Sequence, residues 1–91
     1  MSKSIIQTEK VCYMTGRTSD LDRHHMVPGV AYRKKSEADG LWIWLWHPVH
    51  MQVHEHPEME RALKVLAQRT YEQTHSRAEW MARYHKNYLG D

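Results

Sequence analysis

Two short apolar segments lie in the first half of the chain, and longer patterns of helical period follow in the second half. Residues 21–27 (LDRHHMV) and 41–46 (LWIWLW) are rich in apolar and aromatic types and are bounded by turn-forming residues, which is typical of β-strands. We therefore predict two strands paired as a hairpin with a long connecting loop. Both faces of residues 41–46 are apolar, so this strand should be covered on both sides.

The apolar period changes to that of a helix at Pro57. This proline suits a first helical turn, and the pattern predicts a helix from Pro57 to about Gln73. Ser76 stands three residues before Glu79, the spacing of a capping box, which predicts a last helix that Gly90 ends. The order of hairpin, short histidine segment, helix and helix indicates an α+β fold with the helices on one side of a small sheet.

Length and composition indicate one small domain, residues 1–91, whose core a bound metal would help to stabilise. The chain has 13 Lys and Arg against 11 Asp and Glu, a net charge of +2 that permits a nucleic-acid partner without requiring one. Cys12 is the single cysteine, so no intrachain disulfide can form and a reducing cytosol is expected. The sequence has no apolar run of about 18 residues and no signal-peptide core, so we expect a soluble, cytoplasmic protein without membrane contact.

Histidine is the residue type that changes this picture, because four of the eight histidines fall between residues 47 and 56. His50 and His54 are four apart, which places both imidazoles on one face of a helical turn, close enough to bind one metal ion. Two exposed polar residues on a short helix would have the same spacing. His24 and His25 lie on opposite faces of the first predicted strand. One of them can complete a three-imidazole metal face with His50 and His54, while its neighbour accepts a proton from water. Such a site meets the needs of phosphodiester hydrolysis.

The motifs L-D-R-H-H-M (21–26) and H-P-V-H-M-Q-V-H (47–54) resemble the HNH endonucleases, the ββα-metal family that includes the colicin nuclease domains and many small phage proteins. In that family two strands and a helix bind a single divalent cation. The resemblance implies a ββα-metal hairpin-plus-helix core, here followed by two C-terminal helices. It also implies that His25 is the general base that activates water. The metal ligands that it implies are His24, His50 and His54.

Further segments are similar to small phage-encoded HNH-like proteins, so the resemblance covers roughly residues 12–89. These segments are Arg33-Lys34-Lys35-Ser36, Gly40 to Leu45 and Asn87-Tyr88-Leu89. The chain departs from the family at two places. Many relatives carry two C-x-x-C pairs for a structural zinc, but Cys12 is followed at that spacing by Thr15, and Trp46 stands where the second pair would begin. Asp39 replaces the asparagine that holds the loop bearing the base; it could accept the same backbone hydrogen bond but could not donate one.

Several further side chains could serve the site or contact DNA. Arg23, beside the histidine pair, could clamp the scissile phosphate or be a surface charge at the strand edge. A basic run between the strands could follow the DNA backbone, or be simply a soluble loop. The residues of this run are Arg33, Lys34 and Lys35. His47 could face the metal side of its turn and support the site, or be a surface or capping residue, and His56 is expected to be exposed.

We interpret the sequence as a metal-dependent HNH-type endonuclease or nickase that hydrolyses DNA in the cytoplasm of a bacterial or phage-infected cell. Its cofactor would be one divalent ion, Mg, Mn, Ni or Zn. The alternative is a catalytically silent, metal-stabilised module of phage origin that binds DNA or a protein; a third is a helical interaction protein with incidental histidines. The alternating Trp42, Trp44 and Trp46 favour packing in the core or a homodimer over stacking on unpaired bases.

Overall fold

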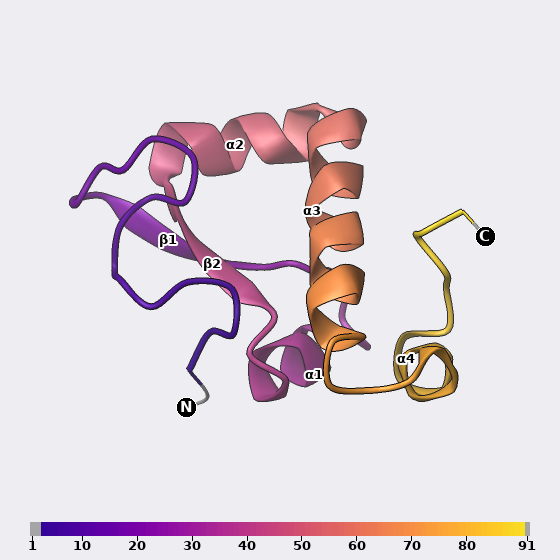
Figure 1. The fold of residues 1–91 in the computed structure, drawn as a ribbon. Helices are drawn as coiled ribbons and strands as arrows, with labels where there is room; N and C mark the ends of the chain where they lie inside the picture. The colour runs from indigo at the N-terminus through magenta and orange to yellow at the C-terminus, as the bar shows by residue number, and fades with distance from the viewer. Residues whose placement is uncertain (1–2, 91) are drawn as a thin grey trace.

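This computed structural model describes residues 3–90, which contain two strands and four helices; residues 1, 2 and 91 of the predicted domain lie outside it. The elements are β1 (Leu21–His25), α1 (Arg33–Ala38), β2 (Trp42–Trp46), α2 (His47–Glu55), α3 (Pro57–Tyr71) and α4 (Arg77–Tyr84). The expected α+β class is confirmed. The chain turns a corner between α2 and α3, and the hairpin lies beside α2 (Figure 1). None of the described helices is long and apolar enough to cross a membrane.

β1 and β2 form an antiparallel pair in which His24 lies opposite Ile43 and His25 opposite Trp42. Side chains alternate along a strand, so directly opposed residues share a face. One face therefore carries Asp22, His24, Ile43 and Leu45, and the other carries Arg23, His25, Trp42 and Trp44. Helix α2 lies over the first face, where the ring of His24 contacts histidines of that helix. The two neighbouring histidines thus start on opposite sides of the hairpin, as strand alternation predicts.

The connection between the strands was expected to be a loop, but it contains the short helix α1. Ser36 in this helix is fully buried. Its Oγ donates to the carbonyl of Leu41 at 2.5 Å and accepts from the amide of Val27 at 3.4 Å, so α1 is fixed to both strand ends. Gly40 follows the helix with φ of +72°, the left-handed conformation that favours glycine. The basic run therefore lies on a helix that is too short, at six residues, to show a periodic apolar stripe.

Strand β2 is fully buried on the face of Ile43 and Leu45, whereas on the other face Trp42 is buried and Trp44 and Trp46 are half-buried, so the predicted cover of both faces is only partly present. Leu41, Ile43 and Leu45 are completely buried in the core. The N-terminal segment runs along the outer edge of the strand: Ser4 Oγ donates to the carbonyl of Trp42 at 2.6 Å, and Gln7 Oε1 accepts from the amide of Trp44 at 2.6 Å. These bonds satisfy backbone groups that an exposed edge would leave open to another chain.

Helices α3 and α4 close the core beside α2. α3 begins at Pro57 as predicted, and the capping box of α4 is present, with Glu79 N donating to Ser76 Oγ and Ser76 N to Glu79 Oε1, each at 3.0 Å. The prediction that α4 continues to Gly90 is wrong. The helix ends at Tyr84 because His85 adopts a left-handed conformation with φ of 64°. The following segment turns back beside α3.

Candidate metal centre

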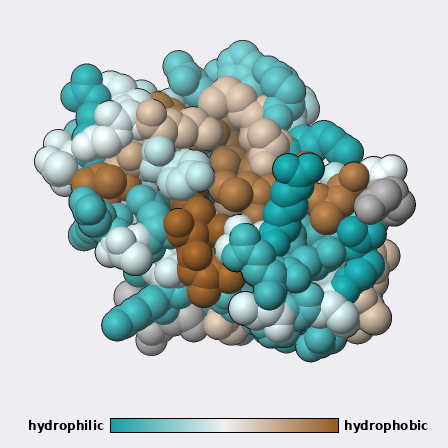
Figure 2. Space-filling view, in the orientation of Figure 1, coloured by the Kyte–Doolittle hydropathy of each residue, from teal (hydrophilic) through white to brown (hydrophobic). Residues whose placement is uncertain are grey.

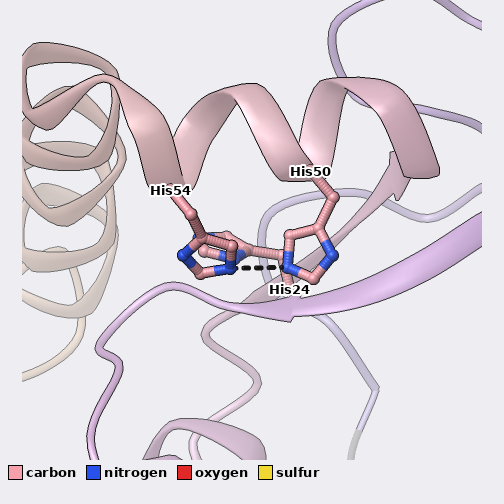
Figure 3. Close-up of side chains that lie close together, drawn as sticks. All are labelled: His24, His50 and His54. Carbon is pink, nitrogen blue, oxygen red and sulfur yellow. Dashed lines mark hydrogen bonds between the residues drawn. The ribbon is translucent and has the colours of Figure 1, made fainter.

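His50 and His54 project from one side of α2 toward β1 (Figure 3). Val49 and Val53, on the neighbouring side of the same helix, are buried in the core and thereby fix the rotation of α2 over the hairpin. The Nε2 atoms of the two histidines are 3.1 Å apart. The predicted i, i+4 pair therefore meets across one helical turn with both nitrogens directed at the same point.

His24 reaches the same point from β1. Its ring centroid lies 5.2 Å from that of His50 and 5.8 Å from that of His54, and one nitrogen of each of the three rings lies within 4.8 Å of the others. His24 is only 2% exposed, and its Nε2 is the one buried side-chain nitrogen or oxygen of the described residues without a hydrogen-bond partner. Buried polar atoms are nearly always paired, so an orphaned imidazole nitrogen facing two others fits a metal ion.

The three-histidine cluster also suits a metal electrostatically. Burial, followed by the nearby His50 and His54, lowers the pKa of His24 to about 3. His24 is therefore neutral at physiological pH, as a metal-binding imidazole must be.

Asp22, two residues before His24 on the same face of β1, contacts α2 as well. One of its carboxylate oxygens, Oδ2, lies 2.6 Å from Nδ1 of His47 and 3.0 Å from Nδ1 of His50. These hydrogen bonds lower the pKa of Asp22. Sequence reasoning gave Asp22 no role, although the i, i+2 spacing on a strand already placed it on the face of His24. His47, for which a supporting or a surface role was left open, touches the cluster only through this carboxylate.

On the opposite face of β1, Arg23 and His25 share a carboxylate from α1. Glu37 Oε1 lies 3.0 Å from His25 Nε2, and both oxygens of Glu37 accept from Arg23 Nη1 at 2.9 and 3.0 Å. Burial opposes ionisation of Glu37, but the bonds from His25 and Arg23 outweigh it and lower the pKa of this carboxyl. The guanidinium of Arg23 also lies 3.8 Å from the ring centre of Trp42. Sequence reasoning missed Glu37, because its contact with β1 depends on the unpredicted helix α1.

Asp39 lies elsewhere. Its Oδ2 accepts from Arg83 Nε and from the hydroxyl of Tyr84, each at 2.5 Å, so this carboxylate ties the end of α1 to α4. The family pattern implies that Asp39 holds the loop that bears His25, but these bonds of Asp39 go to α4 instead. The carboxylate that lies beside His25 is that of Glu37.

Residues from both faces of β1 open into one surface pocket of about 350 Å³, because the strand ends at His25 and the chain turns away. The pocket is lined by Arg23, His24, His25, Pro28, Gly29, Val30, Arg33, His50 and His54. It therefore brings together the predicted base, the three predicted ligands and two arginines. Of the basic run, Arg33 reaches this pocket, Lys34 is exposed, and Lys35 Nζ donates to the carbonyl of Arg83 at 3.1 Å. His56 is exposed, as expected.

No protein-family model, curated protein or solved structure matches this chain. The chemical interpretation of the site therefore rests on its own side chains and on the sequence motifs.

Proposed function

We propose that this chain is a metal-dependent HNH-type endonuclease or nickase that hydrolyses DNA phosphodiester bonds at a ββα-metal site formed by β1, β2 and α2. The observation that carries the proposal is the convergence of His24, His50 and His54 at the pocket that His25 also lines. One divalent ion, Mg, Mn, Ni or Zn, would be held by these three imidazoles and, when bound, would stabilise negative charge on the phosphate and the leaving oxygen.

His25 is the proposed general base. The carboxylate of Glu37 can only accept hydrogen bonds, so Nε2 of His25 carries the proton in their 3.0 Å contact. In the neutral ring this leaves Nδ1 with the lone pair that can take a proton from water. Glu37 thus selects the tautomer of the base and stabilises the imidazolium that forms, the part that a carboxylate plays beside other catalytic histidines.

Two arginines of the pocket are suited to bind the DNA backbone. Arg33 is exposed at the rim, where it can meet a phosphate without breaking a bond of the free protein that holds the site. Arg23 is held against Trp42 and Glu37, so its guanidinium is preoriented beside His25. A scissile phosphate would share this guanidinium with Glu37 through charge-assisted hydrogen bonds.

Nicking of supercoiled plasmid tests the proposal. Protein supplied with each of the four metals in turn should convert supercoiled to open-circular DNA, and His25→Ala should lower the rate at least about 100-fold without changing metal affinity. His50→Ala should instead abolish the metal-induced rise in melting temperature. His56→Ala, which changes an exposed histidine outside the pocket, is the matched control. Wild-type activity in His25→Ala would exclude the base, and a melting temperature of the unmutated protein that no metal changes would exclude the metal centre.

The second candidate is a catalytically silent, metal-stabilised module that binds DNA or a protein. The observation that favours it is the use of Asp39 to hold α4, at the position where the family pattern places a residue that supports the base. This candidate predicts metal-dependent stability and DNA binding with no nicking by the unmutated protein, and equal DNA affinity in His25→Ala.

A further inference from the structure

Asp22 links β1 to the first two turns of α2 through one oxygen atom. Its Oδ2 contacts Nδ1 of both His47 and His50, at 2.6 and 3.0 Å. The backbone reinforces this link, because the amide of His47 donates to the carbonyl of Asp20 at 2.8 Å. The side chain of His47 is 61% exposed, whereas that of His50 is 21% exposed and faces the histidine cluster. The carboxylate therefore lies between an outer and an inner histidine.

The contacts of Asp22 determine which nitrogen of His50 carries a proton. An ionised carboxylate has no hydrogen to donate, so Nδ1 of His50 is the donor in this bond. In a neutral imidazole the other nitrogen, Nε2, then has a free lone pair. Nε2 of His50 is the atom that lies 3.1 Å from Nε2 of His54, at the centre of the cluster (Figure 3). Asp22 thus directs the lone pair of His50 to the place where a metal ligand is needed.

We propose that Asp22 is the positioning residue of the metal centre, which fixes the tautomer and ring orientation of His50, and that His47 in turn holds Asp22 in place. This inference rests on the proposed function only in its metal centre and needs no nuclease activity. Metal-binding histidines commonly donate their second N–H to a carboxylate, and removal of that carboxylate weakens metal binding about 10- to 100-fold. A purely structural bond between β1 and α2 would instead affect the stability of the metal-free protein.

The test compares the affinity for Zn²⁺ of the wild type and Asp22→Asn, measured by competition with a chelator, together with their melting temperatures without metal. Asp22→Asn keeps the size of the side chain and removes its charge, and should weaken Zn²⁺ binding about 10- to 100-fold while the metal-free melting temperature stays within a few degrees. His47→Ala should give a smaller loss, below about tenfold, because Asp22 remains on His50. Asp20→Asn, which changes an exposed aspartate two residues away, is the control and should bind Zn²⁺ as the wild type does.

A second measurement needs no variant. Nitrogen NMR of the wild-type imidazoles without metal should find the proton of His50 on Nδ1, and a proton on Nε2 would overturn the proposal. In the binding experiment, a Zn²⁺ affinity of Asp22→Asn within about twofold of the wild-type value would also overturn it. Absence of Zn²⁺ binding by the wild type would overturn it together with the metal centre. Weakened Zn²⁺ binding in Asp22→Asn, in a protein that nicks no DNA, would support the positioning role of Asp22 and reject the nuclease activity.

Discussion

Glu37 is the side chain that contacts both the proposed base, His25, and the proposed phosphate-binding Arg23. Three hydrogen bonds join this one carboxylate on α1 to two residues on the same face of β1. An imidazole and a guanidinium so close to each other would repel once His25 is protonated, and the negative charge of Glu37 offsets that repulsion. The carboxylate therefore acts on both groups at once.

Replacement of Glu37 by glutamine should lower the nicking rate at saturating DNA by at least about tenfold, since the amide no longer fixes the tautomer of His25 or stabilises its protonated form. Metal affinity should stay at the wild-type value, because Glu37 bonds the face of β1 opposite the ligand His24. Plasmid nicking and a parallel metal titration measure the two effects. Glu58→Gln, an exposed change at the start of α3, should leave both unchanged. An unaltered nicking rate in Glu37→Gln would show that His25 needs no carboxylate.

Sequence spacing was sufficient to bring His50 and His54 together and to separate His24 from His25, because both results follow from the fixed periods of helix and strand. The strand alternation also indicated that one histidine of this pair could join His50 and His54, and the family resemblance implied that it is His24; the geometry agrees with this assignment. The same alternation could have predicted that Asp22 shares the face of His24. It could not have predicted the contact of Glu37 with His25, because this contact joins two elements whose relative placement depends on the buried Ser36.

At the scale of elements, the junction between α1 and β2 depends on Gly40. The residue has φ of +72°, and a Cβ atom there would lie 2.5 Å from the carbonyl oxygen of Lys3 and 3.0 Å from Cγ2 of Ile5. The N-terminal segment is bound at this point, with Ile5 N donating to the carbonyl of Gly40 at 2.9 Å. Gly40 thus lets the chain turn from α1 toward β2 and leaves room for the segment that covers the edge of the strand.

Gly40→Ala should therefore lower the free energy of unfolding by more than the about 1–2 kcal/mol that a left-handed conformation costs an alanine. Gly16 provides the matched comparison, because it has a similar φ of +78° with nothing within 4 Å of its would-be Cβ. Gly16→Ala should lose only the conformational cost. Urea unfolding of the two variants measures the difference. Equal losses would mean that the N-terminal segment does not press on Gly40.

The elements that sequence predicted well have strong local signals at their ends. Pro57 begins α3, and the reciprocal Ser76 and Glu79 bonds begin α4. The end of α4 was misplaced because it depends on a distant contact: Tyr88 N donates to Gln68 Oε1 at 2.7 Å, which draws the last segment onto α3. Helix propensity depends on local sequence and therefore cannot predict such a contact. A histidine also gives no signal for a left-handed conformation at a helix end, whereas a glycine does.

At the scale of the whole molecule, aromatic packing holds α3 and α4 together, and the carboxylate of Asp39 is among the groups that tie them to the first half of the chain. The rings of Trp80 and Tyr84 in α4 pack at a tilt of 37° with their centres 4.3 Å apart, and Tyr71 of α3 meets both rings edge-on. Asp39, from the first half, bonds Tyr84 and Arg83. On the surface, hydrophobic residues gather near the centre of the face in Figure 2, with hydrophilic residues around them, so this small domain leaves part of its apolar surface in contact with solvent. Polar links such as that of Asp39 add to the stability that apolar burial provides.

The link between Asp39 and Tyr84 should make stability sensitive to high pH. Burial, followed by the hydrogen bond to and the charge of Asp39, raises the pKa of Tyr84 far above its usual value of 10.0. In the unfolded chain the phenol ionises near pH 10, while in the folded protein it stays neutral. The stabilisation by Tyr84 is thus complete below pH 10 and is lost as pH rises further, by up to about 1.4 kcal/mol per pH unit.

Tyr84→Phe should remove this share of the pH dependence. The variant should be about 1 kcal/mol less stable at pH 7, since the hydrogen bond to Asp39 is lost. Above pH 10 its free energy of unfolding should fall less steeply than that of the wild type, although Tyr71, whose pKa is also raised chiefly by burial, still contributes to both slopes. Urea unfolding between pH 8 and about pH 11.5 gives the two curves. Tyr13→Phe, which alters an exposed phenol, is the control and should follow the wild-type curve. Parallel curves for Tyr84→Phe and the wild type above pH 10 would show that Tyr84 ionises in the folded state as it does in the unfolded chain.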